Sequence, residues 1–161
     1  MKIRDKYISA KCIEIENLLK ECKNWAASDP KLGAHLATYA NVMILGMLEV
    51  CFEHLVKERA KRPGDLEVGN YIGKHIEDRF RNPNFGLILS VLGQFSDAYR
   101  DEFQKTFNPN SSGVVALNGL LENKTNVAHY GLANLNLSVN DVEIYFGGVV
   151  NILEKLEELL L

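Results

Sequence analysis

Apolar residues recur at three- and four-residue spacing through almost the whole chain, and this pattern constrains the fold more than any other feature. In the first segment the apolar positions are Ile8, Cys12, Ile15, Leu19, Cys22 and Ala26. This spacing is typical of a helix with one buried face. Asp29-Pro30 follows, and proline disfavours the helical conformation in the residue before it. The sequence therefore predicts a first helix over residues 5–27.

The same periodicity predicts helices over residues 33–60, 66–80 and 85–107. A short helix capped by Ser111 or Ser112 should follow, and Ser138 with Asp141 matches a capping box that opens a terminal helix. No stretch alternates polar and apolar residues as a strand would. We therefore expect an all-α fold, an up-and-down bundle of five or six helices, in a single domain that covers residues 1–161.

The composition is that of an ordinary soluble protein, with 47% hydrophobic and 24% charged residues. A formal charge of −3 gives no overall attraction to nucleic acid, so any RNA contact requires a local basic cluster or two subunits together. No apolar run reaches the roughly 18 residues of a membrane span, and the N-terminal region lacks a signal-peptide core. We expect a cytoplasmic protein that does not enter the membrane.

Three dispersed cysteines, Cys12, Cys22 and Cys51, do not form a disulfide framework or a Cys-x-x-Cys zinc pair. Each lies in an apolar helical pattern, which predicts buried, reduced thiols. Trp25, near the end of the first helix, has two interpretations: it covers a small core, which we favour, or it contacts a partner.

Residues 122–131 carry the densest group of polar side chains that could perform chemistry. On a helix, Glu122, Thr125 or Asn126, and His129 recur at offsets of three and four, so they share one face. This arrangement places an imidazole beside an amide, a hydroxyl and a carboxylate.

Lys124 lies five positions before His129, about 140° around an ideal helix. It reaches the same site only if the helix begins or bends near Asn123. The segment thus predicts a polar cluster, and whether Lys124 joins it depends on where the helix starts.

Two other features each allow a structural and a functional interpretation. Glu49, within the apolar run from Val42 to Phe52, is either an acid that accepts a hydrogen bond near the site or an exposed edge charge. The basic residues of 57–62 either complement the dipole at a helix end or line a phosphate path with Lys74, His75, Arg79 and Arg81.

The segment from Lys124 to Gly131 resembles the signature of HEPN domains, in which an arginine, a polar residue (often asparagine) and an Ile/Val-Ala-His-Gly ending follow one another. Val127, Ala128, His129 and Gly131 match this signature. Lys124 occupies the arginine position and Thr125 the next, and both differ from it.

The resemblance extends over most of the chain from about Leu36. Met47-Leu48-Glu49-Val50-Cys51-Phe52 resembles the apolar-Leu-Glu-apolar helix of the RiboL-PSP branch of HEPN proteins. Asn82-Pro83-Asn84-Phe85, followed by an apolar helix that contains Phe95, resembles the Asn-Pro segment of that branch.

This resemblance implies a helical bundle and, for many HEPN proteins, a metal-independent endoribonuclease of toxin or defence systems. His129 would be the base or acid, Lys124 the cation, and Asn126 and Thr125 the donors that position the phosphate. The 2′-hydroxyl would attack the phosphorus and leave a 2′,3′-cyclic phosphate and a 5′-hydroxyl, without metal or cofactor. The site would form in a homodimer, with RNA as substrate.

Two alternatives to the nuclease remain open. The first is a non-catalytic HEPN module that binds a partner protein, RNA or a nucleotide. The second is a partner subunit of a nucleotidyltransferase, one half of a toxin–antitoxin pair. Lys124 favours these alternatives, because an ammonium is a point charge without the planar fork of a guanidinium. The sequence contains no glycine-rich phosphate loop, carboxylate pair at metal-ligand spacing or serine-centred triad.

Overall fold

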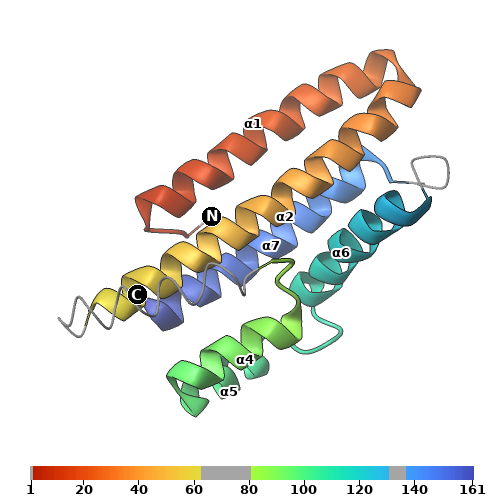
Figure 1. Cartoon of the computed structure of the whole chain (residues 1–161). Helices are drawn as coiled ribbons and strands as arrows, with labels where there is room; N and C mark the ends of the chain where they lie inside the picture. Colours follow the sequence, from red (N-terminus) through yellow and green to blue (C-terminus); the bar gives the residue numbers. More distant parts are fainter. Residues whose placement is uncertain (1, 63–80, 131–136) are drawn as a thin grey trace.

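A computed structural model describes residues 2–62, 81–130 and 137–161 of the chain (Figure 1). These residues form six α-helices and contain no strand: α1 (Lys6–Ser28), α2 (Pro30–Lys61), α4 (Phe85–Phe95), α5 (Asp97–Thr106), α6 (Ser112–Tyr130) and α7 (Val139–Leu160). The all-helical prediction is confirmed for this part of the chain. The helix predicted over 66–80 lies outside the described residues.

A single residue, Asp29, separates the two longest helices. Its backbone is extended, and its Oδ1 accepts the N–H groups of Lys31 at 2.9 Å and Leu32 at 3.2 Å. Pro30 occupies the first turn of α2, where a missing N–H has no cost. The helix therefore begins three residues before the predicted Gly33.

The single helix predicted over 85–107 is wrong, because α4 and α5 are separated at Ser96. Ser96 is extended, with φ −168° and ψ 135°, and its hydroxyl accepts the N–H of Ala98 at 3.2 Å. A serine side chain offers the backbone this alternative to continued helix. The apolar pattern crosses the break unchanged, since Phe103 and Phe107 on the second segment are still buried.

The core forms around α2, which packs against α1, α6 and α7 (Figure 1). The predicted apolar stripe of the terminal helix is confirmed, because all of its members are buried: Val142, Phe146, Val149, Leu153, Leu156 and Leu160. The capping box that opens this helix is also present, with the Ser138 hydroxyl accepting the N–H of Asp141 at 3.1 Å.

The three cysteines are buried and free, as predicted. Burial raises the pKa of the Cys12 thiol to about 11 and that of Cys51 to about 12. These thiols therefore stay protonated at neutral pH and react slowly.

Trp25 does not cover a small core, because 59% of its surface is exposed. Its neighbour Ala26 faces the second helix instead, where a Cβ added to Gly33 would lie 2.9 Å from the Ala26 Cβ. This close approach of α1 to α2 leaves no room for an indole between them.

An 18-residue window of α2 has a mean hydropathy of 1.4 and, by length and composition, could cross a membrane. We did not expect such a window from the sequence. Because 56% of it is buried within the bundle, much of its apolar character is explained by its central position. Apolar side chains of α2 that are exposed include Tyr39, Val42, Met43 and Val50.

Candidate functional site

The HEPN-like segment lies in the second half of α6, which is an unbroken helix from Ser112 to Tyr130. Glu122, Asn126 and His129 follow one another at four- and three-residue spacing on this helix, with Glu122 and His129 exposed and Asn126 half-buried. The helix neither begins nor breaks near Asn123, so Lys124 and His129 project about 140° apart. One chain does not direct both side chains to the same side of α6.

Thr125 uses its hydroxyl proton within the helix. The Oγ1 atom donates to the carbonyl oxygen of Leu121 at 2.9 Å, four residues earlier. In this rotamer the exposed hydroxyl presents only its lone pairs to the outside. Thr125 would have to change rotamer before it could donate to a phosphate.

Lys124 is held by a residue 42 positions away in the sequence. Its Nζ donates a hydrogen bond to the side-chain oxygen of Asn82. The backbone N–H of Asn82 in turn donates to Oε1 of Glu49 on α2. Glu49 thus accepts a backbone hydrogen bond, as one of its two interpretations predicted. We call these residues the Glu49–Asn82–Lys124 cluster.

The backbone at Asn82 has a positive φ of 55°. Asparagine tolerates this left-handed conformation better than most residues with a side chain. The following residues fix the segment, since Pro83 is buried and the Asn84 side chain caps α4 by accepting the Leu87 N–H at 2.8 Å. This conformation points the backbone N–H of Asn82 toward Glu49 on α2 and its side-chain oxygen toward Lys124 on α6.

In the cluster a neutral amide separates a carboxylate from an ammonium. An ammonium has three protons to donate, and the hydrogen bond from Lys124 to Asn82 uses one of them. The group can therefore bind an anion while it keeps its protein contact. No group of three or more His, Cys, Asp or Glu side chains in the described residues could hold a metal ion.

The basic run at the end of α2 is engaged by protein groups. Lys57 pairs with Glu53, Lys61 pairs with Glu58 at 2.7 Å, and Arg59 donates to the Tyr99 hydroxyl at 3.0 Å. These contacts favour a structural role for residues 57–62 at the end of α2 over a role in binding phosphate. Of the other basic residues named for a phosphate path, Arg81 is exposed, and Lys74, His75 and Arg79 lie outside the described residues.

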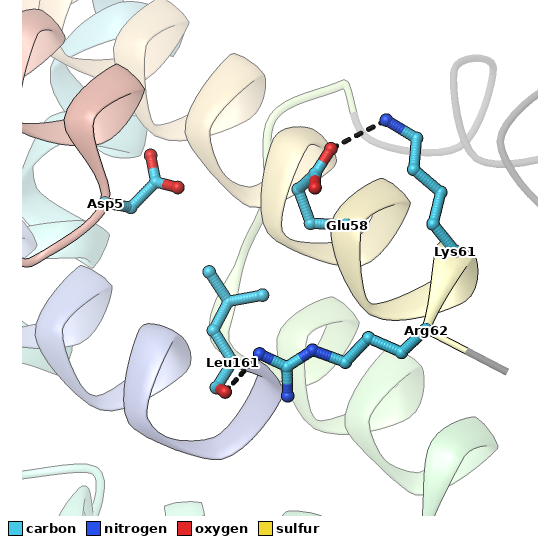
Figure 2. Close-up of a pocket in the computed structure, with 5 residues that line it drawn as sticks. All are labelled: Asp5, Glu58, Lys61, Arg62 and Leu161. Atoms are coloured by element: carbon cyan, nitrogen blue, oxygen red, sulfur yellow. Dashed lines mark hydrogen bonds and ion pairs between the residues drawn. The ribbon is translucent and has the colours of Figure 1, made fainter. Parts of the chain in front are cut away.

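An open pocket of about 300 Å³ lies at the far end of α2 and is lined by Asp5, Glu58, Lys61, Arg62 and Leu161 (Figure 2). The sequence did not predict it. Lys61 pairs with Glu58, and Arg62 donates to the main-chain oxygen of Leu161. Lys61 is 12 residues beyond Glu49 on the same helix, about 18 Å away at 1.5 Å per residue. The pocket is therefore separate from the cluster.

The sequence did not predict that Lys124 and Asn82 are in contact. Only the local conformation of Asn82 could have been suspected from the sequence, because an Asn-Pro pair often marks a turn and asparagine favours positive φ. Searches against protein-family profiles, curated proteins and solved structures found no match to this chain.

Proposed function

We propose that this protein is a HEPN-type, metal-independent endoribonuclease of a toxin or defence system, active in the cytoplasm as a homodimer. One observation carries the proposal. The three segments on which the HEPN resemblance rests are distant in the sequence, yet one residue from each meets in the Glu49–Asn82–Lys124 cluster. A chance resemblance in three separate segments would not require such contacts.

The exposed imidazole of His129 acts as the base that removes the ribose 2′-hydroxyl proton or as the acid that gives a proton to the departing 5′-oxygen, because imidazole is the side chain suited to both roles near neutral pH. The 2′-oxygen bonds to the phosphorus as the bond from phosphorus to the 5′-oxygen breaks, so one proton leaves the 2′-oxygen and one reaches the 5′-oxygen. Lys124 stabilises the charge that develops on the phosphate. Asn126 and, after a rotamer change, Thr125 donate hydrogen bonds to the phosphate oxygens. The strand is cleaved to a 2′,3′-cyclic phosphate and a 5′-hydroxyl.

The divergence of Lys124 and His129 on α6 supports a site shared by two chains. With the side chains about 140° apart on one helix, a phosphate held by Lys124 of one chain is more accessible to the partner's His129. Each chain then supplies half of each site.

A second candidate is a non-catalytic HEPN module that binds a partner protein such as an antitoxin or nucleotidyltransferase, an RNA, or a nucleotide. The observation that favours it is the contact between Lys124 and Asn82. Because the Lys124 ammonium already donates to the Asn82 amide, it should stabilise the transition state less than a free guanidinium with two parallel donors would.

The deciding experiment incubates the purified protein with a mixed RNA pool in EDTA, beside His129→Ala and the matched control His35→Ala. His35 is also exposed but lies on α2. We expect the parent and His35→Ala to cleave RNA and leave cyclic-phosphate ends, and His129→Ala to be inactive. Lys124→Arg should cleave faster than the parent.

If the parent and His129→Ala are equally inert at high concentration, or equally active, the nuclease proposal is wrong. Retention of RNA or of a nucleotide by the inert parent would then support the binding module.

A further inference from the structure

Arg81 is exposed, and its side chain forms no hydrogen bond or ion pair with any residue that the structure describes. Three other arginines donate to protein oxygens: Arg59, Arg62 and Arg100. A guanidinium without a protein partner keeps all of its N–H donors for an anion. Arg81 therefore has the chemistry to bind a charged group from outside the chain.

The backbone of Arg81 is fixed although its side chain is free. The peptide group that joins Arg81 to Asn82 carries the N–H that Oε1 of Glu49 accepts. Glu49 is half-buried on α2, and Pro83, on the other side of Asn82, is buried. The fold thus holds the Cα of Arg81 beside the Glu49–Asn82–Lys124 cluster and leaves the long side chain able to adapt to a ligand.

Arg81 is the immediate neighbour of the residue that holds Lys124. Consecutive Cα atoms are about 3.8 Å apart, and the side-chain oxygen of Asn82 accepts a hydrogen bond from the Lys124 Nζ. The arginine side chain is long enough to bring its guanidinium to the ammonium across this short separation. The two cations can therefore contact oxygens of one and the same anion.

The carboxylates near these two cations leave them available. Glu49 uses Oε1 for the N–H of Asn82, and no ion pair joins Glu49 to Arg81 or Lys124 in the described structure. Glu122 is two residues before Lys124 on α6, so its side chain projects about 160° away around the helix. The positive charge of the pair is thus not neutralised by a direct carboxylate contact.

We propose that Arg81 and Lys124 bind the same phosphate of an RNA strand, and that Arg81 supplies the guanidinium that the HEPN signature has at position 124. The planar fork of Arg81 donates to two phosphate oxygens, and the Lys124 ammonium acts as a point charge beside them. The role of Arg81 in cleavage rests on the proposed function. The phosphate site itself rests on the position of Arg81 and on its lack of a protein partner.

Binding of a mixed-sequence 2′-O-methyl RNA oligonucleotide, followed by fluorescence anisotropy, tests the phosphate site without cleavage, because this strand has no 2′-hydroxyl to attack. Arg4→Gln is the matched control for Arg81→Gln, since Arg4 is also exposed, has no side-chain partner among the described residues and precedes α1. We expect Arg81→Gln to weaken binding about 10-fold. Arg4→Gln should change it by less than about 2-fold.

The salt dependence of binding separates the charge of Arg81 from its fork. Arg81→Gln should lower the slope of log affinity against log salt by about 0.7, the value for one phosphate contact on a single strand. Arg81→Lys should keep the parent slope and bind with an affinity between those of the parent and Arg81→Gln. No binding by the parent at about 100 µM in low salt, or equal losses from Arg81→Gln and Arg4→Gln, would overturn the inference.

A double-mutant cycle tests whether the two side chains share one phosphate. Lys124→Arg should improve the affinity of Arg81→Gln more than that of the parent, because the parent already has a guanidinium at this phosphate. Equal gains in the two backgrounds would place Arg81 and Lys124 on different phosphates and contradict the shared site.

Cleavage of unmodified RNA in EDTA distinguishes this inference from the proposed function. Arg81→Gln should cleave about 100-fold more slowly than the parent, and Arg4→Gln at the parent rate. If Arg81→Gln cleaves as fast as the parent, the role of Arg81 is wrong and the nuclease stands. If the parent is inert but binds the 2′-O-methyl strand through Arg81, the nuclease is wrong and the phosphate site stands.

Discussion

Glu157 on the last helix accepts the backbone N–H of Arg4 at 3.0 Å with each of its two carboxylate oxygens. It also accepts the N–H of Asp5. These N–H groups immediately precede α1, and only 9% of Glu157 is exposed. A buried carboxylate thus holds the start of the first helix against the last.

Glu157→Gln should lower the free energy of unfolding by about 1–3 kcal/mol, because the amide loses the charge and one of the two acceptor oxygens that the partly buried N–H groups of Arg4 and Asp5 use. Urea denaturation measures this loss. The control Glu158→Gln alters an exposed neighbour that pairs with Lys155, and it should change stability by less than about 0.5 kcal/mol. Equal effects from the two variants would contradict the assigned role of Glu157.

Asp5 should contribute a stability that disappears in acid. Partial burial alone would raise its pKa, but hydrogen bonds from the Ile8 N–H and His54 outweigh burial and hold the pKa below the ordinary 3.8. Because the pKa is lower in the folded state, the contribution is complete above the unfolded value and is lost as pH falls through the folded value.

Asp5→Asn isolates this charge, since asparagine caps a helix as well as aspartate does. The variant should have a lower Tm than the parent near neutral pH, and the difference should shrink as the pH falls below about 3.8. Thermal melts from pH 2 to 7 provide the measurement. A difference that stays constant over this range would show that the charge has no role.

Gly147 and Gly148 are neighbours on α7 that should respond oppositely to alanine. A Cβ on Gly148 would lie 2.5 Å from the Cβ of Ala116, whereas one on Gly147 would have nothing within 4 Å. Gly148→Ala should destabilise the protein by about 1–3 kcal/mol through overpacking. Gly147→Ala should stabilise it by about 0.5–1 kcal/mol through helix propensity.

The double variant Gly148→Ala/Ala116→Gly provides a rescue test for this contact. It removes the clashing methyl group and should recover part of the loss in a urea titration. Additive effects of the two substitutions would place the strain elsewhere.

Asn82 should tolerate glycine better than alanine because of its positive φ. Asn82→Gly keeps the backbone and its N–H to Glu49 but removes the amide oxygen that Lys124 contacts. Asn82→Ala adds a strain of about 1–2 kcal/mol. Urea titration should therefore order the stabilities as parent, glycine variant, alanine variant, and an alanine variant as stable as glycine would contradict this geometry.

The helices could be predicted from the sequence because their apolar spacing and caps are local properties. Asp29-Pro30 marked the boundary of α1 and α2, and Ser138 with Asp141 marked the start of α7. The break at Ser96 was not predictable from periodicity, because Phe103 continues the same apolar face after it.

The tertiary roles of polar residues could not be predicted. Glu157 lies among leucines in a sequence that also suits an exposed charge, and its partners are about 150 positions away. Similarly, no local pattern indicates that Lys124 contacts Asn82. The candidate residues on α6 were named from their helical spacing and from the HEPN resemblance, and the face that each one occupies follows from the local geometry of a single helix.

A buried amide fixes the longitudinal position of α6. Asn41 on α2 is 1% exposed, donates through Nδ2 to the carbonyl oxygen of Leu120 at 3.0 Å, and its Oδ1 has no hydrogen-bond partner in the described structure. Sliding α6 by one turn, about 5.4 Å, would break this bond and carry Lys124 out of reach of Asn82. Asn41→Leu would therefore be expected to keep the bundle intact while it removes this hydrogen bond between α2 and α6, so that α6 can shift along α2 and the Lys124 ammonium is no longer held at one position relative to Asn82.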